Sequence, residues 1–430
     1  MSRSKKLKRS KKKKLISLLI ILSILFLLIT CLIFGFYYGL KGLRNNVSKL
    51  PSNEKDKISE DLNTNEVNTI TLTAVGDIMV HMPQLTAQYD SSTNSYCFDN
   101  NFQHVKNYVK NSDFSIANLE TTLAGSSIGY SSYPVFNSPD SLSTALNNCG
   151  FNILSTINNH SLDKGDLGLE RTLKILKQDG FDVVGTKNSS YEKNFIIKKK
   201  HGISLGITSF SYAEIKNSIK YVNGLPASSD TSDKINVFDV HNVDNAFNSI
   251  SKTLSEMNNP DIKIVILHWG NEYQRVPSSF QTSLAQKLCD VGVDIIIGSH
   301  PHVVQPVDII TSSDNKKETL VIYSLGNFLS NQRRELMGTP YTEDGLLVNI
   351  NITKKSKYDT ARISKVECIP TWLNKYYTDS KSVYEIIPIS NKEELSNIKN
   401  LPYNKLKKSF ENTTSLIKHS DLISYPKNLF

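Results

Sequence analysis

Residues 293–302 read VDIIIGSHPH, and this stretch decides the fold. Its first five residues form an apolar run that is typical of a buried parallel strand, and Gly298 ends the run. His300 and His302 follow at the carboxyl end of the strand, where open α/β sheets place their ligand sites. Imidazole is also a preferred ligand of zinc, iron and other transition metals. A single His-x-His pair is weak support for a metal site, since an incidental pair of loop residues is the simpler interpretation.

Several other apolar runs also end in side chains that bind metals. We expect strands at residues 70–75, 114–117, 153–157 and 262–267, and the side chains that follow them are Asp77, Glu120, Asn159 and His268. Five of the nine histidines fall at such strand ends, namely His81, His160, His268, His300 and His302. This clustering favours a metal-dependent active site, or the descendant of one.

Six of these residues form a mixed nitrogen and oxygen ligand set that is large enough for two metal ions. The set is Asp77, Glu120, Asn159, His268, His300 and His302. Two metal ions about 3.5–4 Å apart can activate water and polarise a phosphoryl oxygen. The mixture of donors suits manganese, iron or zinc better than calcium. His160 could protonate a leaving group, and Asp163 could orient the ring of that histidine.

Each candidate also has a simpler structural interpretation when it is taken alone. Asp77 and Asp163 could cap helices that begin just after them. Glu120 could be a solvated charge in a loop, and His268 could be a structural histidine after a buried strand. The number of such residues at strand ends, rather than any one of them, supports the metal site.

Strand and helix patterns alternate from residue 69 onward, which argues for a layered α/β domain with mixed sheets. Further strands are expected at 203–210, 294–297, 320–323 and 384–389, with helices at 243–257 and 278–290. Another helix is expected to carry Leu169, Leu173 and Leu176 on one face and to stop at Gly180. We interpret residues 323–328, YSLGNF, as a strand-to-loop turn in which Asn327 could position a site residue. The domain is placed at residues 69–372, and residues 373–430 are interpreted as a C-terminal extension that packs on it.

The charge of the chain is concentrated at its beginning. Of the 50 lysines and arginines, nine lie in residues 1–14, which contain no acidic residue. The rest of the chain carries 41 basic and 41 acidic residues, so the net charge of +9 comes from this tail alone. A neutral remainder gives no support for nucleic-acid binding by the folded domain.

Residues 15–40 form an uncharged run of 26 residues rich in leucine and isoleucine. As a helix it would be about 39 Å long, more than the roughly 30 Å hydrocarbon core of a membrane. The run lacks a small-residue cleavage site at its end, which favours an uncleaved transmembrane anchor over a signal peptide. The basic tail 1–14 should stay in the cytoplasm, with a flexible linker at 41–68 and the main domain outside the cell.

With these motifs in view, the chain resembles the bacterial capsule synthesis protein family of the CapA type, which is associated with poly-γ-glutamate. The matching stretches are AVGD at 74–77, ANLE at 117–120, NNHSLD at 158–163, HWG at 268–270, GSHPH at 298–302 and YSLGNF at 323–328. They occur in the order of the family and cover roughly residues 70–330.

That family is similar to the calcineurin-type metallophosphoesterases, which are four-layer α/β sandwiches with two metals. The resemblance implies Asp77 and His302 on one metal, Glu120 between the two, and a second metal held by Asn159, His268 and His300. It also implies His160 as proton donor. The sequence departs from the wider pattern in two places. It has DIMVH at 77–81 where Asp-x-His is usual, which leaves the role of His81 open, and it has Glu120 where a Gly-Asp-x-x-Asp motif is usual.

Two functions from different classes follow from the resemblance and from the ligand set. The first is a membrane component, anchored at the cell surface, that helps to make, move or anchor an anionic capsule polymer together with membrane partners. The second is a surface metallohydrolase that acts on a phosphoester or on bonds of the polymer. The fold alone does not decide between them.

Overall fold

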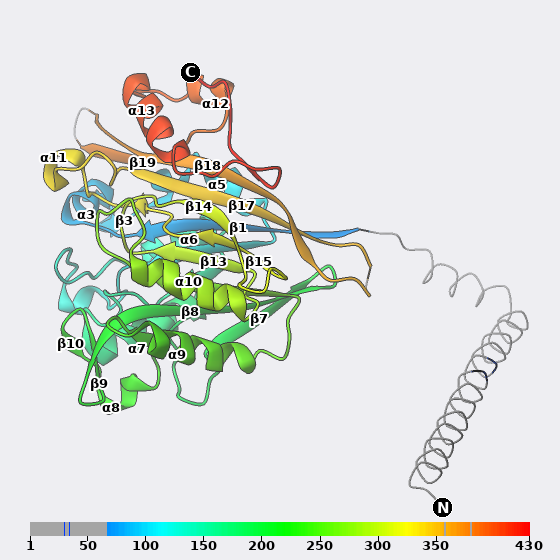
Figure 1. Ribbon diagram of the computed structural model, residues 1–430. Coiled ribbons are helices and arrows are strands. Elements are labelled where there is room, and N and C mark those ends of the chain that lie inside the picture. Colours follow the sequence, from blue (N-terminus) through cyan, green and yellow to red (C-terminus); the bar gives the residue numbers. More distant parts are fainter. Residues whose placement is uncertain (1–29, 31–33, 35–66, 357, 379–380) are drawn as a thin grey trace, which may run out of the picture. The chain divides into compact units, whose positions relative to one another are not determined.

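The computed structural model describes residues 30, 34, 67–356, 358–378 and 381–430 (Figure 1). Residues Val67–Phe430 form one compact unit. The predicted tail 1–14 and nearly all of the predicted anchor and linker lie outside the described residues. Among the helices of the described part, none has the length and apolar character needed to cross a membrane.

The first of two large sheets has the strand order β19-β18-β17-β1-β4-β5-β6, with β16 beside β1 and β20 beside β18. Its parallel part comprises β1 (Asn68–Ile78), β4 (Phe114–Leu119), β5 (Ile153–Ser155), β6 (Asp182–Val184) and β16 (Asn327–Leu329). Its antiparallel part comprises β17 (Asp344–Lys354), β18 (Arg362–Tyr377) and β19 (Ser382–Pro388), and the short β20 (Ile423–Ser424) runs parallel to β18.

The second sheet has the order β10-β9-β8-β12-β13-β15-β14, and β7 and β11 both pair with β8. Its parallel strands are β8 (Ile203–Lys216), β11 (Val237–Asp239), β12 (Ile262–His268), β13 (Ile295–Ser299) and β15 (Glu318–Ile322). Its antiparallel additions are β7 (Phe195–Lys200), β9 (Ile219–Val222), β10 (Leu225–Pro226) and β14 (Val307–Thr311). Both sheets are therefore mixed, which confirms the predicted α/β class. A separate small hairpin joins β2 (Tyr89–Asp90) to β3 (Ser95–Tyr96).

The two sheets pack face to face, because alternate residues of their strands enter one shared core. On β12, Ile264 and Ile266 lie in this core, whereas Val265 and Leu267 face the helices on the other side. Leu72 on β1 enters the same shared core from the first sheet. This alternation explains why the strands read as continuous apolar runs, since both of their faces are buried.

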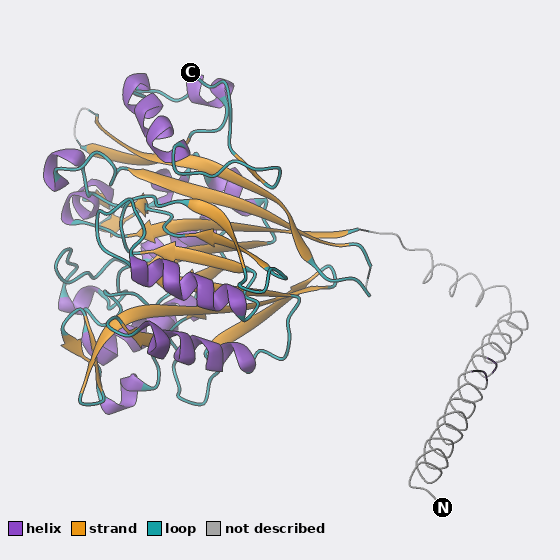
Figure 2. Cartoon of the chain, viewed as in Figure 1, coloured by secondary structure: helices purple, strands orange, loops and turns teal. Residues whose placement is uncertain are grey.

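Helices cover the outer faces and give four layers (Figure 2). The first sheet is covered by α3 (Met82–Gln88), α4 (Asp99–Phe102), α5 (Lys106–Lys110) and α6 (Ser141–Cys149), and the second by α9 (Val243–Ser255) and α10 (Ser279–Asp290). Between the sheets' edges, α7 (Gly165–Gln178) packs beside β6. The start of α10 follows from its sequence, because the Ser278 hydroxyl accepts from the backbone N–H of Gln281 and the Gln281 side chain accepts from the backbone N–H of Ser278.

The C-terminal part continues the first sheet. Strand β18 runs across position 372, the predicted domain boundary, and β19 adds the edge strand expected at residues 384–389. Two helices, α12 (Lys392–Ser396) and α13 (Tyr403–Thr414), follow it. The second of them packs on β17 and β18.

Candidate metal centre

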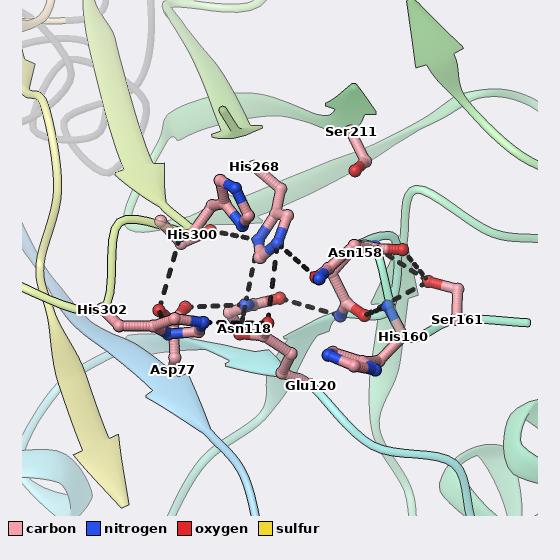
Figure 3. Close-up of polar contacts among 12 residues, drawn as sticks. Asp77, Asn118, Glu120, Asn158, His160, Ser161, Ser211, His268, His300 and His302 are labelled. Atoms are coloured by element: carbon pink, nitrogen blue, oxygen red, sulfur yellow. Dashed lines mark hydrogen bonds and ion pairs between the residues drawn. The ribbon is translucent and has the colours of Figure 1, made fainter. Parts of the chain in front are cut away.

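The predicted ligand residues come together at the carboxyl ends of strands from both sheets (Figure 3). Asp77 is the last residue but one of β1 and pairs with Asn118 of β4, and Glu120 follows β4 directly. His268 ends β12 beside Ser299 of β13. The two sheets thus deliver carboxylates from one side and imidazoles from the other.

Glycine is required where the backbones approach each other behind the site. A Cβ added to Gly298 would lie 1.9 Å from the carbonyl oxygen of Tyr323, a distance that no side chain can tolerate. The loop after β13 then adopts unusual backbone angles, with φ of 97° at His300 and 57° at His302. Non-glycine residues with positive φ cost energy and concentrate at functional sites, so this loop is held in a constrained shape.

Two groups of buried side chains gather ligand atoms within 4.8 Å of one another. One contains Glu120, His300 and His302, and the other contains Asp77, Glu120 and His268. Glu120 belongs to both groups. A carboxylate shared in this way has two oxygens with which to contact two metal ions.

Asn118 connects the two carboxylates. Its Nδ2 donates to Asp77 Oδ1 at 2.8 Å and to Glu120 Oε2 at 3.2 Å. Its Oδ1 accepts from Asn158 Nδ2 at 3.1 Å. Asn118 therefore fixes the positions of both acids while leaving Glu120 Oε1 free.

The imidazoles are held by oxygen atoms. His302 Nδ1 lies 3.1 Å from both Asp77 Oδ2 and Asn327 Oδ1, which are acceptors, so we assign the ring proton to this nitrogen. Its Nε2 then points a lone pair toward Glu120 Oε1, 3.8 Å away. His268 Nε2 lies 2.8 Å from Asn159 Oδ1 and 3.6 Å from Glu120 Oε1. The predicted ligands Asn159 and His268 thus meet in a hydrogen bond from Nε2 to Oδ1, which metal binding through these two atoms would replace.

Two buried polar atoms in this cluster have no hydrogen-bond partner, namely Glu120 Oε1 and His300 Nδ1. An unsatisfied buried acceptor costs about 1–3 kcal/mol, so proteins seldom leave such atoms without a ligand. Both atoms belong to residues of the ligand groups described above. A transition-metal ion fits this donor set, because it would satisfy both atoms at once.

Burial affects the protonation of the carboxylate and of the histidines in opposite ways: two of the histidines are held in the neutral form, whereas Glu120 must lose a proton to bind a metal. Burial, and then the nearby Asp77, raises the pKa of Glu120 well above its ordinary value. Burial, followed by the neighbouring histidines, lowers the pKa of His268 and of His300 well below the usual 6.5. These two rings are therefore neutral at physiological pH, which is the form that binds metals.

His160 and Asp163 form a buried pair next to the ligand cluster. His160 Nδ1 lies 2.8 Å from Asp163 Oδ2, and the same oxygen accepts from the backbone N–H of Phe136 at 2.6 Å. The ring edge of Phe136 packs on His160, with the ring centroids 4.7 Å apart. Asp163 thus orients the imidazole, whereas Lys164 occupies the N-cap position of α7.

His81 lies outside both ligand groups. Its Nδ1 accepts from the backbone N–H of Asn331 at 3.1 Å, and its ring packs on Phe136. Burial, and then His302, lowers its pKa to about 4. In this arrangement His81 braces the loop after β16 rather than joining the ligand cluster.

Of the residues beside the ligands, Asn118 and Tyr212 were not assigned a role from the sequence, whereas Asn327 was. Asn118 shares a strand face with Glu120, two positions away, and this spacing is the signal that could have identified it. Asn327 lies in the turn after β15 and accepts a hydrogen bond from His302 Nδ1, which is the positioning role expected of it. Tyr212, whose ring centroid lies 4.7 Å from that of His300, carries no such signal.

Comparison with known proteins gives a family match over most of this domain. The model of the family described as bacterial capsule synthesis protein PGA_cap matches residues 71–332. Capsule biosynthesis protein CapA of Bacillus anthracis is 31% identical over 295 residues, which are 67% of this chain and 65% of that protein. PGA biosynthesis protein CapA of Bacillus subtilis is 26% identical over 331 residues, 74% of this chain and 77% of that protein. The chain thus spans just under two thirds of the first relative.

A solved structure is more distant. Sulfate thiohydrolase SoxB of Thermus thermophilus, in complex with glycerol, is 12% identical, with a TM-score of 0.34. The superposition covers 74% of this chain and 46% of that one. A likeness at this level supports no conclusion about the fold or the chemistry of the site.

Proposed function

Because the chain belongs to the bacterial capsule synthesis protein family, we propose that it helps to make or export an anionic capsule polymer at the cell surface. The names of the two Bacillus relatives support this role, since both refer to biosynthesis of a capsule or of PGA. The uncharged run at residues 15–40 would anchor the protein in the cell membrane beside membrane partners of the synthesis complex.

We further propose that the domain is metallophosphoesterase-like and carries a hydrolytic centre with two metals. One observation carries this proposal. Glu120 belongs to both ligand groups, and its Oε1 is buried without a hydrogen-bond partner, as is His300 Nδ1. A purely structural polar core would satisfy these atoms internally. Asp77, Glu120, Asn159, His268, His300 and His302 would hold the metals, with manganese, iron or zinc as the ions that suit the donors.

Two such ions would supply Lewis acidity and a water of lowered pKa. The residues of the chain do the rest. Asn118 and Asn327 hold the ligands in position before substrate arrives. His160, oriented by Asp163 through Nδ1, presents Nε2 as the proton donor for the leaving group. Burial of the whole cluster keeps bulk water from competing with the substrate.

The test is a phosphodiesterase assay on the purified full-length protein loaded with manganese, iron or zinc. We expect hydrolysis that falls by roughly 10²–10⁴-fold in His160→Gln, the usual contribution of a general acid. Its metal content should be unchanged, because His160 lies outside both ligand groups. The matched control is His419→Gln, a histidine near the C-terminus. Equal activity in His160→Gln and wild type would contradict the proton-donor role.

The capsule role needs a separate test in the cell. Deleting the gene should lower the amount of surface polymer, and a His160→Gln allele would show whether catalysis is required for that role. The alternative is a surface phosphoester hydrolase unrelated to capsule, which the His160–Asp163 pair beside a phosphoesterase-type ligand set favours. Unchanged surface polymer together with retained hydrolysis would favour this alternative.

A further inference from the structure

A small polar cavity lies between α13 and the start of β17, outside the metal centre. Its walls come from α11 (Arg334–Met337), the loop that follows it, the first residue of β17, β18 and α13. The cavity has a volume of about 50 Å³, whereas one water molecule needs roughly 10–15 Å³. It therefore has room for a few non-hydrogen atoms, which is too little for a nucleotide or a sugar ring.

The inner wall of the cavity is buried and polar. Asp344 of β17 is 3% exposed, and Ser409 of α13 is 2% exposed. The Ser409 hydroxyl oxygen has no hydrogen-bond partner. Asn412, one turn further along α13, donates from Nδ2 to Asp344 Oδ2 at 3.0 Å. Buried hydroxyls are seldom left without a partner, so the cavity calls for a polar group beside Ser409.

Asp344 also lacks a partner of opposite charge. Burial raises the pKa of Asp344 to about 7, although the Asn412 amide and the charge of Arg275 act in the opposite direction. No lysine or arginine among the described residues forms an ion pair with Asp344, whereas the neighbouring Glu343 is paired with Arg333 at 3.2 Å. Burying a carboxylate without a paired charge is costly, so Asp344 offers a place for a positively charged group of a ligand.

The mouth of the cavity carries charges of both signs. Arg334 and Lys405 line it and are exposed, as is Glu335. In the part of the chain that the structure describes, the side chains of Arg334 and Lys405 form no ion pair. Apart from Glu343, which is already paired, the lining thus has two cations, and two carboxylates from Glu335 and Asp344. A lining that is neutral overall and holds both signs matches a zwitterion.

A metal ion is a poorer match for this cavity. Among the described residues, the two groups of side chains that gather metal-ligand atoms both lie in the metal centre, and neither contains Asp344. The cations Arg334 and Lys405 would also repel a divalent ion at the mouth. An inorganic anion would meet the buried carboxyl group of Asp344 at the inner wall.

We propose that this cavity binds the zwitterionic group of a small amino acid, either free or at the end of a peptide chain. The ammonium lies at the inner wall, where it donates to the Asp344 carboxylate and to the Ser409 hydroxyl oxygen. The carboxylate lies at the mouth and accepts from Arg334 and Lys405. The proposal does not rest on the hydrolytic function, because the cavity contains none of the metal-ligand residues.

A ligand-detected NMR titration of the full-length protein tests the cavity. A chelator is present, so that no metal ion can hold an amino acid at the metal centre. The probes are glycine, N-acetylglycine, which lacks the ammonium, and glycinamide, which lacks the carboxylate. Glycine should bind roughly ten- to a hundredfold more tightly than either, as expected for hydrogen bonds between charged groups. Glycylglycine distinguishes the two sources, because it should match glycine only if the cavity accepts the end of a peptide chain.

Variants of the lining assign the two halves of the zwitterion. Asp344→Asn should reduce the preference for glycine over N-acetylglycine to nearly one. Lys405→Gln should reduce the preference over glycinamide and leave the preference over N-acetylglycine intact. The matched control is Lys408→Gln, which changes an exposed lysine of α13 outside the lining and should bind as the wild type does. If Asp344→Asn does not fold, Ser409→Ala replaces it, and its affinity for glycine should fall by about two- to tenfold.

Four results would overturn the proposal. They are no binding of glycine to the wild type, equal binding of glycine and N-acetylglycine, a preference between these two that survives in Asp344→Asn, and an unchanged affinity in Ser409→Ala. Calcium chloride is titrated separately without chelator, and a cavity that binds calcium but not glycine would overturn it as well. None of these results bears on the hydrolytic function, which is measured with the metal centre loaded.

Discussion

Replacing Asn118 by leucine should destabilise the metal-free protein strongly, although the side chain keeps nearly the same size. The change removes the amide that donates to Asp77 at 2.8 Å and to Glu120 at 3.2 Å. The hydrogen bond to Asp77 involves a charged acceptor and contributes about 1.5–3 kcal/mol to the free energy of unfolding. The hydrogen bond to Glu120 contributes about 1 kcal/mol, the value for neutral groups, because the raised pKa of Glu120 favours its protonated form. The free energy of unfolding should therefore fall by about 2.5–4 kcal/mol.

Urea unfolding of the full-length protein in a chelator measures this loss. Asn107→Leu is the matched control, because Asn107 is exposed on α5, and its effect should stay within about 0.5 kcal/mol. Adding manganese should stabilise the wild type by about 2.7 kcal/mol at a hundred times its Kd, and the variant by less. A loss below 1 kcal/mol for Asn118→Leu in chelator would refute the view that this amide holds the two acids together.

Three further predictions concern pH, packing and the C-terminal helix. The pKa of Glu120 is raised in the folded state, so above pH 4.5 the unfolded chain loses the proton of this residue while the folded chain still holds it. The free energy of unfolding in chelator should therefore decrease as the pH rises above 4.5. This decrease should be smaller in Glu120→Gln, as urea titrations at several pH values would detect. Gly76→Ala places a Cβ 1.9 Å from the carbonyl oxygen of Gly326 and should cost about 3 kcal/mol by thermal unfolding, and a cost below 1 kcal/mol would contradict this contact. Arg275→Ala removes the bond to the Asn412 carbonyl, so hydrogen exchange should speed up in α13 and not in β12.

The strands and the meeting of the ligands could be predicted from the sequence. The strand at 293–297 reads as a buried run because its alternate residues enter two different cores, and β12 behaves in the same way. Parallel strands place their carboxyl ends at one edge, so Asp77, Glu120 and His268 were expected to lie together. The structure places their ligand atoms within one cluster.

The shape of the loop that carries His300 and His302 could not be predicted in the same way. The family resemblance placed His300 with His268 on one metal, and this division stays a prediction: the His300 ring centroid lies 4.7 Å from that of His268, and a ligand atom of His300 also lies within 4.8 Å of those of His302 and Glu120. Both histidines of the loop after β13 have positive φ angles. No periodicity in the sequence encodes such backbone angles, because they follow from tertiary contacts.

Tyr212 could not be predicted for a related reason. It lies in the second half of the long strand β8, where serines alternate with Phe210 and Tyr212. Its place beside His300 depends on the pairing of β8 with β12, which sets His268 beside Ser211. The register between strands that are distant in the sequence is set by packing, so the local sequence of one strand does not predict it.

Elemental analysis of the full-length protein tests the two-metal centre most directly. After loading and gel filtration, the wild type should retain about two transition-metal ions per chain, and His300→Ala about one, since His300 belongs to one ligand group. Glu120→Gln should retain fewer than about one, because Glu120 belongs to both groups. A wild type that holds no metal, or a Glu120→Gln protein that still holds two, would contradict the account.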